Sequence, residues 1–324
     1  MPEKLAKILD REGVHRVYLG KLSGVYPSDG HNLERRRYQL SGSKKVVRVS
    51  PLNAVVFACI FQDVKKAGKA MLEFLNVVLE YVGEEPIVEI LDLKSEYAVF
   101  GESADQKYGR LDVRVKAESG RLFDVEVQIE KDYMNERGFF YGGRMGEDEF
   151  KSGDPYDKMP EVRVINIVDF YVRDDKTNVV EPVYLTYGNN PGEIATDKFK
   201  MYHIQLPAFR KEHKTLESVM GDKFNSWLYM FDRGYQNPDE MEVLSGMTEG
   251  LKNFAAQYNF AINDPDLIRR YRMFEDGKRD VATKVSVAEK NAHLKDAKRM
   301  KADGMDPKLI TKYTGISELE IEKL

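Results

Sequence analysis

Acidic and amide side chains alternate with apolar ones along residues 109–129, which read GRLDVRVKAESGRLFDVEVQI. The alternation predicts two β-strands. Because successive strand side chains point to opposite faces, Asp112, Glu126 and Gln128 share one face. The intervening ESG at 118–120 suits a three-residue turn with glycine in the left-handed conformation. This turn places Asp112 directly opposite Glu126, with their Cβ atoms about 5 Å apart.

Two carboxylates held this close destabilise a sheet unless something neutralises them. A divalent cation such as Mg2+ can do so, because proteins hold it through one or two carboxylates plus substrate phosphates. The hairpin therefore predicts a metal site. Two ordinary explanations stay open: the acids can lie on a solvated hairpin face, or Arg110 or Arg114 can neutralise Asp112 without a metal.

The composition is that of a soluble globular protein, with 324 residues, 42% hydrophobic, 32% charged and a net charge of −4. Such a chain has no general attraction for nucleic acid, so any contact with DNA must come from local basic patches. Cys59 is the only cysteine, which excludes internal disulfides and cysteine-rich zinc modules and favours a cytoplasmic location. We expect no membrane association, because the longest strongly apolar run, Ala54–Phe61, is too short to cross a bilayer.

The regular pattern begins near residue 50 and alternates helical and strand periods. Helices are expected at Leu52–Phe61, Gly68–Val82 and Asp132–Phe150, and strands at Ile87–Leu91, Tyr97–Phe100, the hairpin, Val162–Val172, Val179–Leu185 and Phe199–Leu206. The nearly continuous apolar run from Val162 indicates a central strand covered on both faces. This order predicts an α/β domain over residues 51–235. Residues 1–50, with a strand expected at Lys45–Val49, form an extension that the pattern does not place.

Residues 236–324 are predicted to form a helical C-terminal region, with helices at Pro238–Phe260, Pro265–Glu275 and Thr283–Ala302 followed by two short ones. The short helices are marked by Asp306-Pro307, Gly315 and a capping box at Ser317–Glu320. Residues 278–301 carry eight Lys or Arg and three Asp or Glu, which suits phosphate contact or, more ordinarily, a solvated helix face. The two short helices suggest a helix-turn-helix, but they offer few basic residues for a major-groove reader. A small oligomerisation or interaction module, which would make the chain a homo-oligomer through its C-terminal helices, is at least as good an interpretation.

Four blocks of this chain together resemble the PD-(D/E)XK nuclease family of transposase-like proteins, also called recombination-promoting nucleases. They are LEFLNVVL at 72–79, the hairpin with its aspartate and E-x-Q at 109–128, NERGFFY at 135–141 and GDPYDKMPEVRVINIVDF at 153–170. The tail at 305–324 is also similar, and the likeness covers roughly residues 50–324.

The resemblance implies a restriction-endonuclease-like mixed sheet flanked by helices, and metal-dependent cleavage of DNA. The family's metal ligands map to Asp112 and Glu126, with Mg2+ or Mn2+ as the cofactor. The general nuclease motif ends in lysine, whereas Gln128 stands there in this chain, as in the transposase-like branch. A glutamine can orient water or a phosphate oxygen through hydrogen bonds but supplies no charge.

Within that framework each residue near the hairpin has an expected role. The backbone carbonyl of Val127 adds a metal ligand, and Gln128 positions the attacking water. Arg137 and Tyr141 are four residues apart on a predicted helix and so share one face, where Arg137 can clamp a phosphate and Tyr141 can contact the sugar or phosphate. The alternatives are a structural ion pair between Arg137 and Glu130 or Asp132, and a core position for Tyr141. A glutamate of the first helices, Glu73 or Glu80, is a further candidate ligand.

The leading hypothesis is therefore a cytoplasmic, Mg2+-dependent DNA endonuclease acting in recombination or mobile-element biology. A second hypothesis is a nuclease fold retained as a DNA-binding or protein-interaction module without catalysis. A third is a structural protein whose helical tail drives self-association. The five histidines show no paired helical spacing, which gives a zinc hydrolase little support.

Overall fold

The computed structural model describes residues 48–95, 113–174 and 177–324. These residues divide into two compact units, one of residues 48–95, 113–174 and 177–267 and the other of residues 268–324. Helices at 238–262, which the sequence pattern grouped with the C-terminal region, belong to the first unit. Among the described residues, no helix is both long and apolar enough to span a bilayer.

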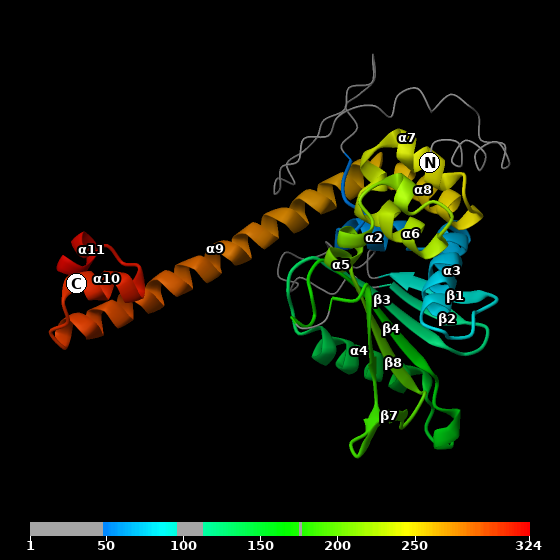
Figure 1. Cartoon of the computed structure of the whole chain (residues 1–324), viewed down its shortest axis with the longest axis horizontal. Coiled ribbons are helices and arrows are strands. Elements are labelled where there is room, and N and C mark those ends of the chain that lie inside the picture. Colours follow the sequence, from blue (N-terminus) through cyan, green and yellow to red (C-terminus); the bar gives the residue numbers. More distant parts are fainter. Residues whose placement is uncertain (1–47, 96–112, 175–176) are drawn as a thin grey trace, which may run out of the picture. The chain divides into compact units, whose positions relative to one another are not determined.

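The first unit is built on a mixed six-stranded sheet with the order β1-β2-β3-β4-β8-β5 (Figure 1). Strands β1 to β3 are antiparallel, β3, β4 and β8 are parallel, and β5 is antiparallel to β8. The strands are β1 (Ile90–Ser95), β2 (Val113–Ala117), β3 (Leu122–Gln128), β4 (Val162–Val168), β5 (Val180–Tyr184) and β8 (Phe199–Gln205); β6 (Thr186–Tyr187) and β7 (Asn190–Ile194) form a separate pair. All seven residues of β4 are buried, which confirms the prediction of a central, doubly covered strand.

Helices lie on both faces of the sheet, so the predicted α/β class with a mixed sheet flanked by helices is confirmed (Figure 1). The α4 helix packs on the face that carries the even-numbered residues of β3 and β4, whereas α2 and α3 contact β3 and β1. The helices are α2 (Ala54–Ile60), α3 (Val64–Tyr81), α4 (Met134–Glu149), α5 (Leu206–Glu212), α6 (Lys223–Asp232), α7 (Pro238–Ser245) and α8 (Glu249–Ile262).

Aromatic side chains dominate the core between α2, α3, α6 and α8. The indole of Trp227 lies 5.7 Å from the ring centroids of both Phe74 and Phe254, and Phe231 lies 5.2 Å from each of those two rings. All four side chains are almost fully buried. Large tilted and edge-on rings give this layer much apolar burial with defined geometry.

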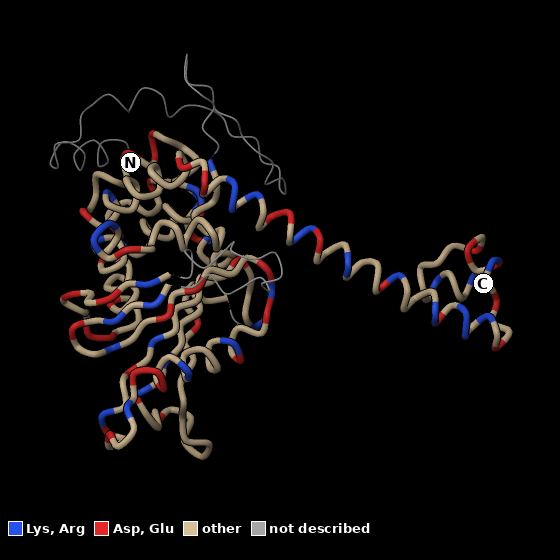
Figure 2. The backbone as a smooth tube through the Cα atoms, turned by 180° about the vertical axis from the view of Figure 1, so that it is seen from behind, with Lys and Arg blue, Asp and Glu red and all other residues tan. Residues whose placement is uncertain are grey.

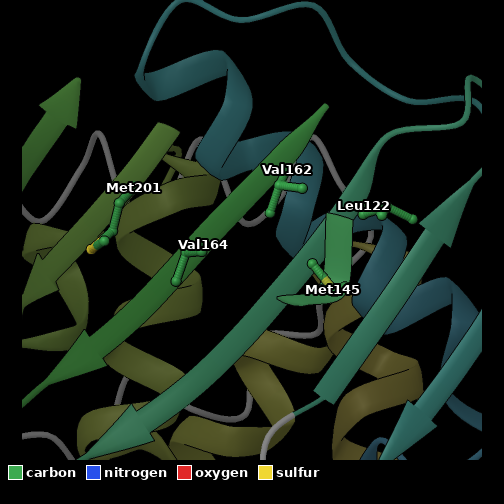
Figure 3. Close-up of a cluster of buried hydrophobic side chains, with 5 residues drawn as sticks. All are labelled: Leu122, Met145, Val162, Val164 and Met201. Atoms are coloured by element: carbon green, nitrogen blue, oxygen red, sulfur yellow. The ribbon is translucent and has the colours of Figure 1, made fainter. Parts of the chain in front are cut away.

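Glycines on α4 allow that helix to approach the sheet closely. A Cβ at Gly142 would lie 2.7 Å from the Phe199 ring and 2.8 Å from Val164 Cγ2, and one at Gly138 would lie 2.7 Å from Met201 Cε. Below the helix, one buried cluster joins β3, β4, β8 and α4 (Figure 3); it consists of Leu122, Met145, Val162, Val164 and Met201. The close approach fixes how the first turns of α4 lie over the sheet.

Two neighbouring glycines of α4 give a matched test of this packing. Gly142→Ala is expected to lower the free energy of unfolding by about 1–3 kcal/mol, because the added methyl overpacks the contact with Phe199 and Val164. Gly143→Ala should instead raise it by about 0.5–1 kcal/mol, because nothing lies within 4 Å of that position and alanine is the better helix former. Urea unfolding of both variants measures the difference. Equal effects of the same sign would contradict the close approach.

The second unit contains α9 from residue 268 onward, α10 (Pro307–Thr314) and α11 (Glu318–Glu322). Its small core consists of Ala297, Ile310, Ile316 and Ile321, with Leu294, Met300 and Leu324 packed against it. The predicted caps are confirmed: Asp306 and Ser317 accept hydrogen bonds from the first turns of their helices, and Gly315 ends α10 with φ of 71°.

Several predicted boundaries differ from the structure. The expected helix Pro238–Phe260 is two helices, because Gly246 ends α7 and Thr248 caps α8. The two helices expected between 265 and 302 are one continuous α9 (Pro265–Ala302). The expected strand Tyr97–Phe100 and most of Lys45–Val49 lie outside the described residues, and α5 and α6 were not foreseen.

Candidate active site on the hairpin strand

The hairpin of β2 and β3 has the register that its sequence predicts. Val113 pairs with Val125 and Lys116 with Leu122, and the Ala117 N–H donates to the Arg121 carbonyl at 2.9 Å. The turn glycine, Gly120, has φ of 82°, in the left-handed region that glycine adopts readily. Asp112 lies outside the described residues, so its position opposite Glu126 stays a prediction.

Glu126 lies on the buried part of this hairpin and is bound by an arginine of α4. Its side chain is 6% exposed, and its Oε1 accepts a hydrogen bond from Arg137 Nη2 at 2.5 Å. Arg137 Nη1 lies 3.0 Å from Asp132 Oδ2. Burial alone would lower the pKa of Arg137, but the carboxylates of Glu126 and Asp132 raise it, so the guanidinium stays charged. The sequence alternative of an Arg137–Asp132 ion pair is confirmed, whereas the bond to Glu126 was not foreseen.

Tyr141 lies one helical turn beyond Arg137 on the same face of α4, as the four-residue spacing predicts. The Arg137 guanidinium lies 5.9 Å from the centroid of the Tyr141 ring, a cation–π distance. Tyr141 is only partly buried, which places it at the edge of the site rather than in the core. Contact of either residue with substrate stays a prediction.

Gln128 and Val127 lie at the carboxyl end of β3. The Gln128 side-chain amide donates to the Glu130 carbonyl at 3.1 Å, and the Gln128 backbone carbonyl accepts from the Asp169 N–H at 3.0 Å, on the β4 side. Because alternate strand carbonyls point in opposite directions, the Val127 carbonyl points toward the β2 side. The water-positioning and ligand roles of these residues stay predictions.

The donor set around Glu126 suits a hard divalent cation. Carboxylate and carbonyl oxygens are ligands that suit Mg2+ and Mn2+. A carboxylate has two oxygens with several lone pairs, so Glu126 can hold Arg137 through one oxygen and a cation through the other. Within the described ranges, no group of three or more His, Cys, Asp or Glu side chains is arranged to hold a metal ion, and the remaining expected ligand, Asp112, lies outside them.

A row of buried polar residues continues from Glu126 across the sheet, and the sequence did not predict it. Strand pairing aligns Glu126 with Asn166, Asn166 with His203, and His203 with Glu181. His203 Nδ1 lies 3.2 Å from the Asn166 amide nitrogen, and Nε2 lies 2.9 Å from Asn135 Oδ1 on α4. Nδ1 therefore accepts and Nε2–H donates. Burial lowers the pKa of His203 to about 4, so the ring is neutral at physiological pH.

One signal in the sequence could have revealed this row. Asn166 interrupts the apolar run Val164–Val168, and His203 lies within FKMYHIQ, so each is a polar residue in a buried strand. Buried polar groups require hydrogen-bond partners, which predicts that such residues meet one another. The partners themselves depend on the parallel pairing of distant segments.

A second group of ion pairs lies at the carboxyl end of β4, next to the end of β3 at Gln128. Arg210 of α5 binds Asp169, which directly follows β4, and its Nη2 lies 2.5 Å from Asp232 Oδ1 at the end of α6. Burial opposes the charge on Arg210, but hydrogen bonds to the two carboxylates raise its pKa well above the usual value. The group thereby ties α5 and α6 to the carboxyl end of β4.

The helical glutamates proposed as further ligands have other positions. Glu73 Oε1 accepts from Trp227 Nε1 at 3.0 Å and from the Thr248 hydroxyl, and its Oε2 accepts from the Gly250 N–H at 3.0 Å. These bonds place its carboxylate at the N-terminus of α8, where a negative charge is favoured. Glu80 is exposed on α3. Glu73 thus joins α3, α6 and α8.

Comparison with known protein families gave one match, to the description "PD-(D/E)XK nuclease family transposase", over residues 51–288. That range contains β3 with Glu126, all of α4 and the whole buried polar row. Comparisons with curated proteins and with solved structures gave no match. The matched range covers well over half of the chain and agrees with the mixed sheet flanked by helices. The chain belongs to the PD-(D/E)XK nuclease family of transposases.

Proposed function

We propose that this protein is a divalent-metal-dependent DNA endonuclease, with Asp112 and Glu126 as ligands of Mg2+ or Mn2+. The family match over residues 51–288 carries the proposal, because it includes the strand of Glu126 and the helix of Arg137. Membership indicates a nuclease-like protein whose substrate is DNA, and PD-(D/E)XK nucleases generally use divalent metals. A cytoplasmic location and a role in recombination or mobile elements are part of the same proposal.

The described side chains have definite tasks in such a reaction. A bound divalent cation supplies charge relief on the phosphate and lowers the pKa of a coordinated water. Glu126 holds the cation, and the neutral amide of Gln128 orients the attacking water through hydrogen bonds. Arg137, already 2.5 Å from Glu126, offers its guanidinium to a phosphate oxygen at the same place. Tyr141, beside Arg137, donates its hydroxyl to the sugar or phosphate.

A plasmid-nicking assay tests the proposal. The purified chain should nick supercoiled DNA with Mg2+ or Mn2+ and stop when a chelator is added. Glu126→Gln and Asp112→Asn should each slow nicking by about a hundredfold or more. Glu136→Gln is the matched control, because Glu136 is an exposed carboxylate of α4 beside Arg137. Equal nicking by all four proteins, or none by any under varied metals, would overturn the proposal.

One observation favours the second hypothesis, a nuclease fold that binds DNA or protein without cleaving. Arg137 already neutralises Glu126 at 2.5 Å, so this carboxylate has a counter-charge without any metal. A non-catalytic module should bind DNA in chelator, and the binding should survive Asp112→Asn and Glu126→Gln. A gel-shift titration with and without Mg2+ separates the two functions.

A further inference from the structure

The middle of α9 is exposed on every side. Each residue from 279 to 293 is exposed, including the large apolar side chains of Val281, Val285 and Val287 at 44%, 50% and 55%. All of these residues belong to the second unit. In Figure 2, basic and acidic positions alternate along this helix.

This segment is a poor helix former on its own. Val281, Thr283, Val285 and Val287 are β-branched and lose side-chain freedom in a helix, and helices of roughly 12–15 residues are marginal in water without a packed face. Ion pairs add little stability to this segment. Within the described part of α9, the ion pairs made by residues 279–293 are Arg279–Asp276 at 2.7 Å and Lys290–Glu320 at 3.2 Å. A partner that covers one face would supply the missing stabilisation.

The apolar residues define that face. Val281, Val285, Ala288 and Ala292 are spaced by four, three and four residues, the spacing of a coiled-coil seam. The two alanines permit close approach of a partner backbone. Lys284 and Asn291 flank the seam on one side and Ala282 and Glu289 on the other, so Lys284 and Glu289 are its charged flanking residues. Val287 lies outside the seam.

We propose that residues 279–293 pair, parallel and in register, with the same segment of a second copy of this chain. In a parallel, in-register pair, a residue on one side of the seam meets the residue five positions later in the partner helix, on the other side of the seam. Lys284 therefore meets Glu289 of the second copy. Two-fold symmetry makes this ion pair twice. In an antiparallel pair each flank faces its own equivalent, so no register brings Lys284 to Glu289. The positions of Lys284 and Glu289 therefore favour a second copy of this chain as the partner and a parallel orientation of the two helices.

Pairing of this kind goes beyond the proposed function and does not depend on it. The segment is joined to the first unit through residue 268, so parallel pairing links both first units to the same end of the helix pair. A two-copy assembly would hold two candidate sites for two DNA strands.

Charge exchange in the full chain tests the pairing. Lys284→Glu and Glu289→Lys each set like charges together, so each should raise the dimer dissociation constant about tenfold or more in sedimentation equilibrium. The double variant should restore the wild-type value, and an equimolar mixture of the two single variants should associate as a heterodimer. Arg279→Glu is the control for Lys284→Glu, because it makes the same change in net charge away from the seam. Wild-type chain that stays monomeric at high micromolar concentration, or single variants that associate like wild type, would overturn the proposal.

Cysteine cross-linking tests the direction separately. Val281→Cys and Ala292→Cys, made one at a time, should both form disulfide-linked dimers under mild oxidation, because equivalent seam positions meet in a parallel pair. In an antiparallel pair at most one of them can lie on the two-fold axis. The native Cys59 is buried, and the wild-type chain is the control. Failure of both variants, or linking by one alone, would contradict parallel pairing.

Discussion

Arg137→Met is expected to lower the free energy of unfolding by about 3 kcal/mol, because it leaves the buried Glu126 carboxylate without its counter-charge. The estimate is at the lower end of the usual range since the Arg137 side chain is 30% exposed. Urea unfolding near neutral pH measures the loss. Arg144→Met is the matched control, because Arg144 is exposed on the same helix, and it should change stability by less than about 0.5 kcal/mol.

A double variant isolates the ion pair from the packing of the arginine stem. Glu126→Gln/Arg137→Met removes both charges, so it should be more stable than Arg137→Met alone. If Glu126 also binds a metal, Mg2+ should raise the melting temperature of Arg137→Met but not of the double variant. An Arg137→Met protein as stable as Arg144→Met would show that Glu126 does not depend on Arg137.

Acidification is expected to cost the fold about 3 kcal/mol through His203 alone. Burial holds its pKa at about 4 in the folded chain, below the usual value near 6.5 in the unfolded chain. The unfolded chain therefore takes up the proton first as the pH falls. The stabilisation is complete above about pH 6.5 and is lost progressively toward pH 4.

His203→Gln separates this contribution from other acid-sensitive groups. Glutamine can keep a hydrogen bond toward Asn135 but does not titrate in this range. Between pH 6.5 and 4.5, wild-type stability should fall more steeply than that of His203→Gln. Glu181 on β5 and Glu126 two strands away are present in both proteins, so neither carboxylate accounts for a difference between the two curves. Parallel stability curves would mean that folding does not lower the pKa of His203.

The predicted loss of stability at low pH and the predicted loss of stability in Arg137→Met both concern the same buried layer of the protein. His203 and Glu126 both lie in the row of polar residues beneath the start of α4. Burial keeps His203 neutral, and Arg137 forms an ion pair with Glu126. The helix can cover both only because Gly138 and Gly142 let it approach β4 and β8.

Residue patterns within short segments of the sequence predicted several features of the fold and of the candidate site. Alternation and the turn glycine predicted the hairpin register, which the pairing of Val113 with Val125 confirms. The apolar run from Val162 predicted a central strand, and the four-residue spacing of Arg137 and Tyr141 predicted a shared helix face. Each of these depends on residues close in sequence, where strand and helix geometry alone decide which side chains meet.

Long-range packing sets which residues from distant segments meet. The parallel alignment of β3, β4 and β8 brings Asn166 and His203 level with Glu126, and the packing of α4 gives Arg137 a second carboxylate. The same limit applies to α9, where the sequence pattern predicted two helices and the structure has one continuous helix. Periodicity records which face of an element is apolar, but the partner of that face depends on long-range packing, which local sequence does not encode.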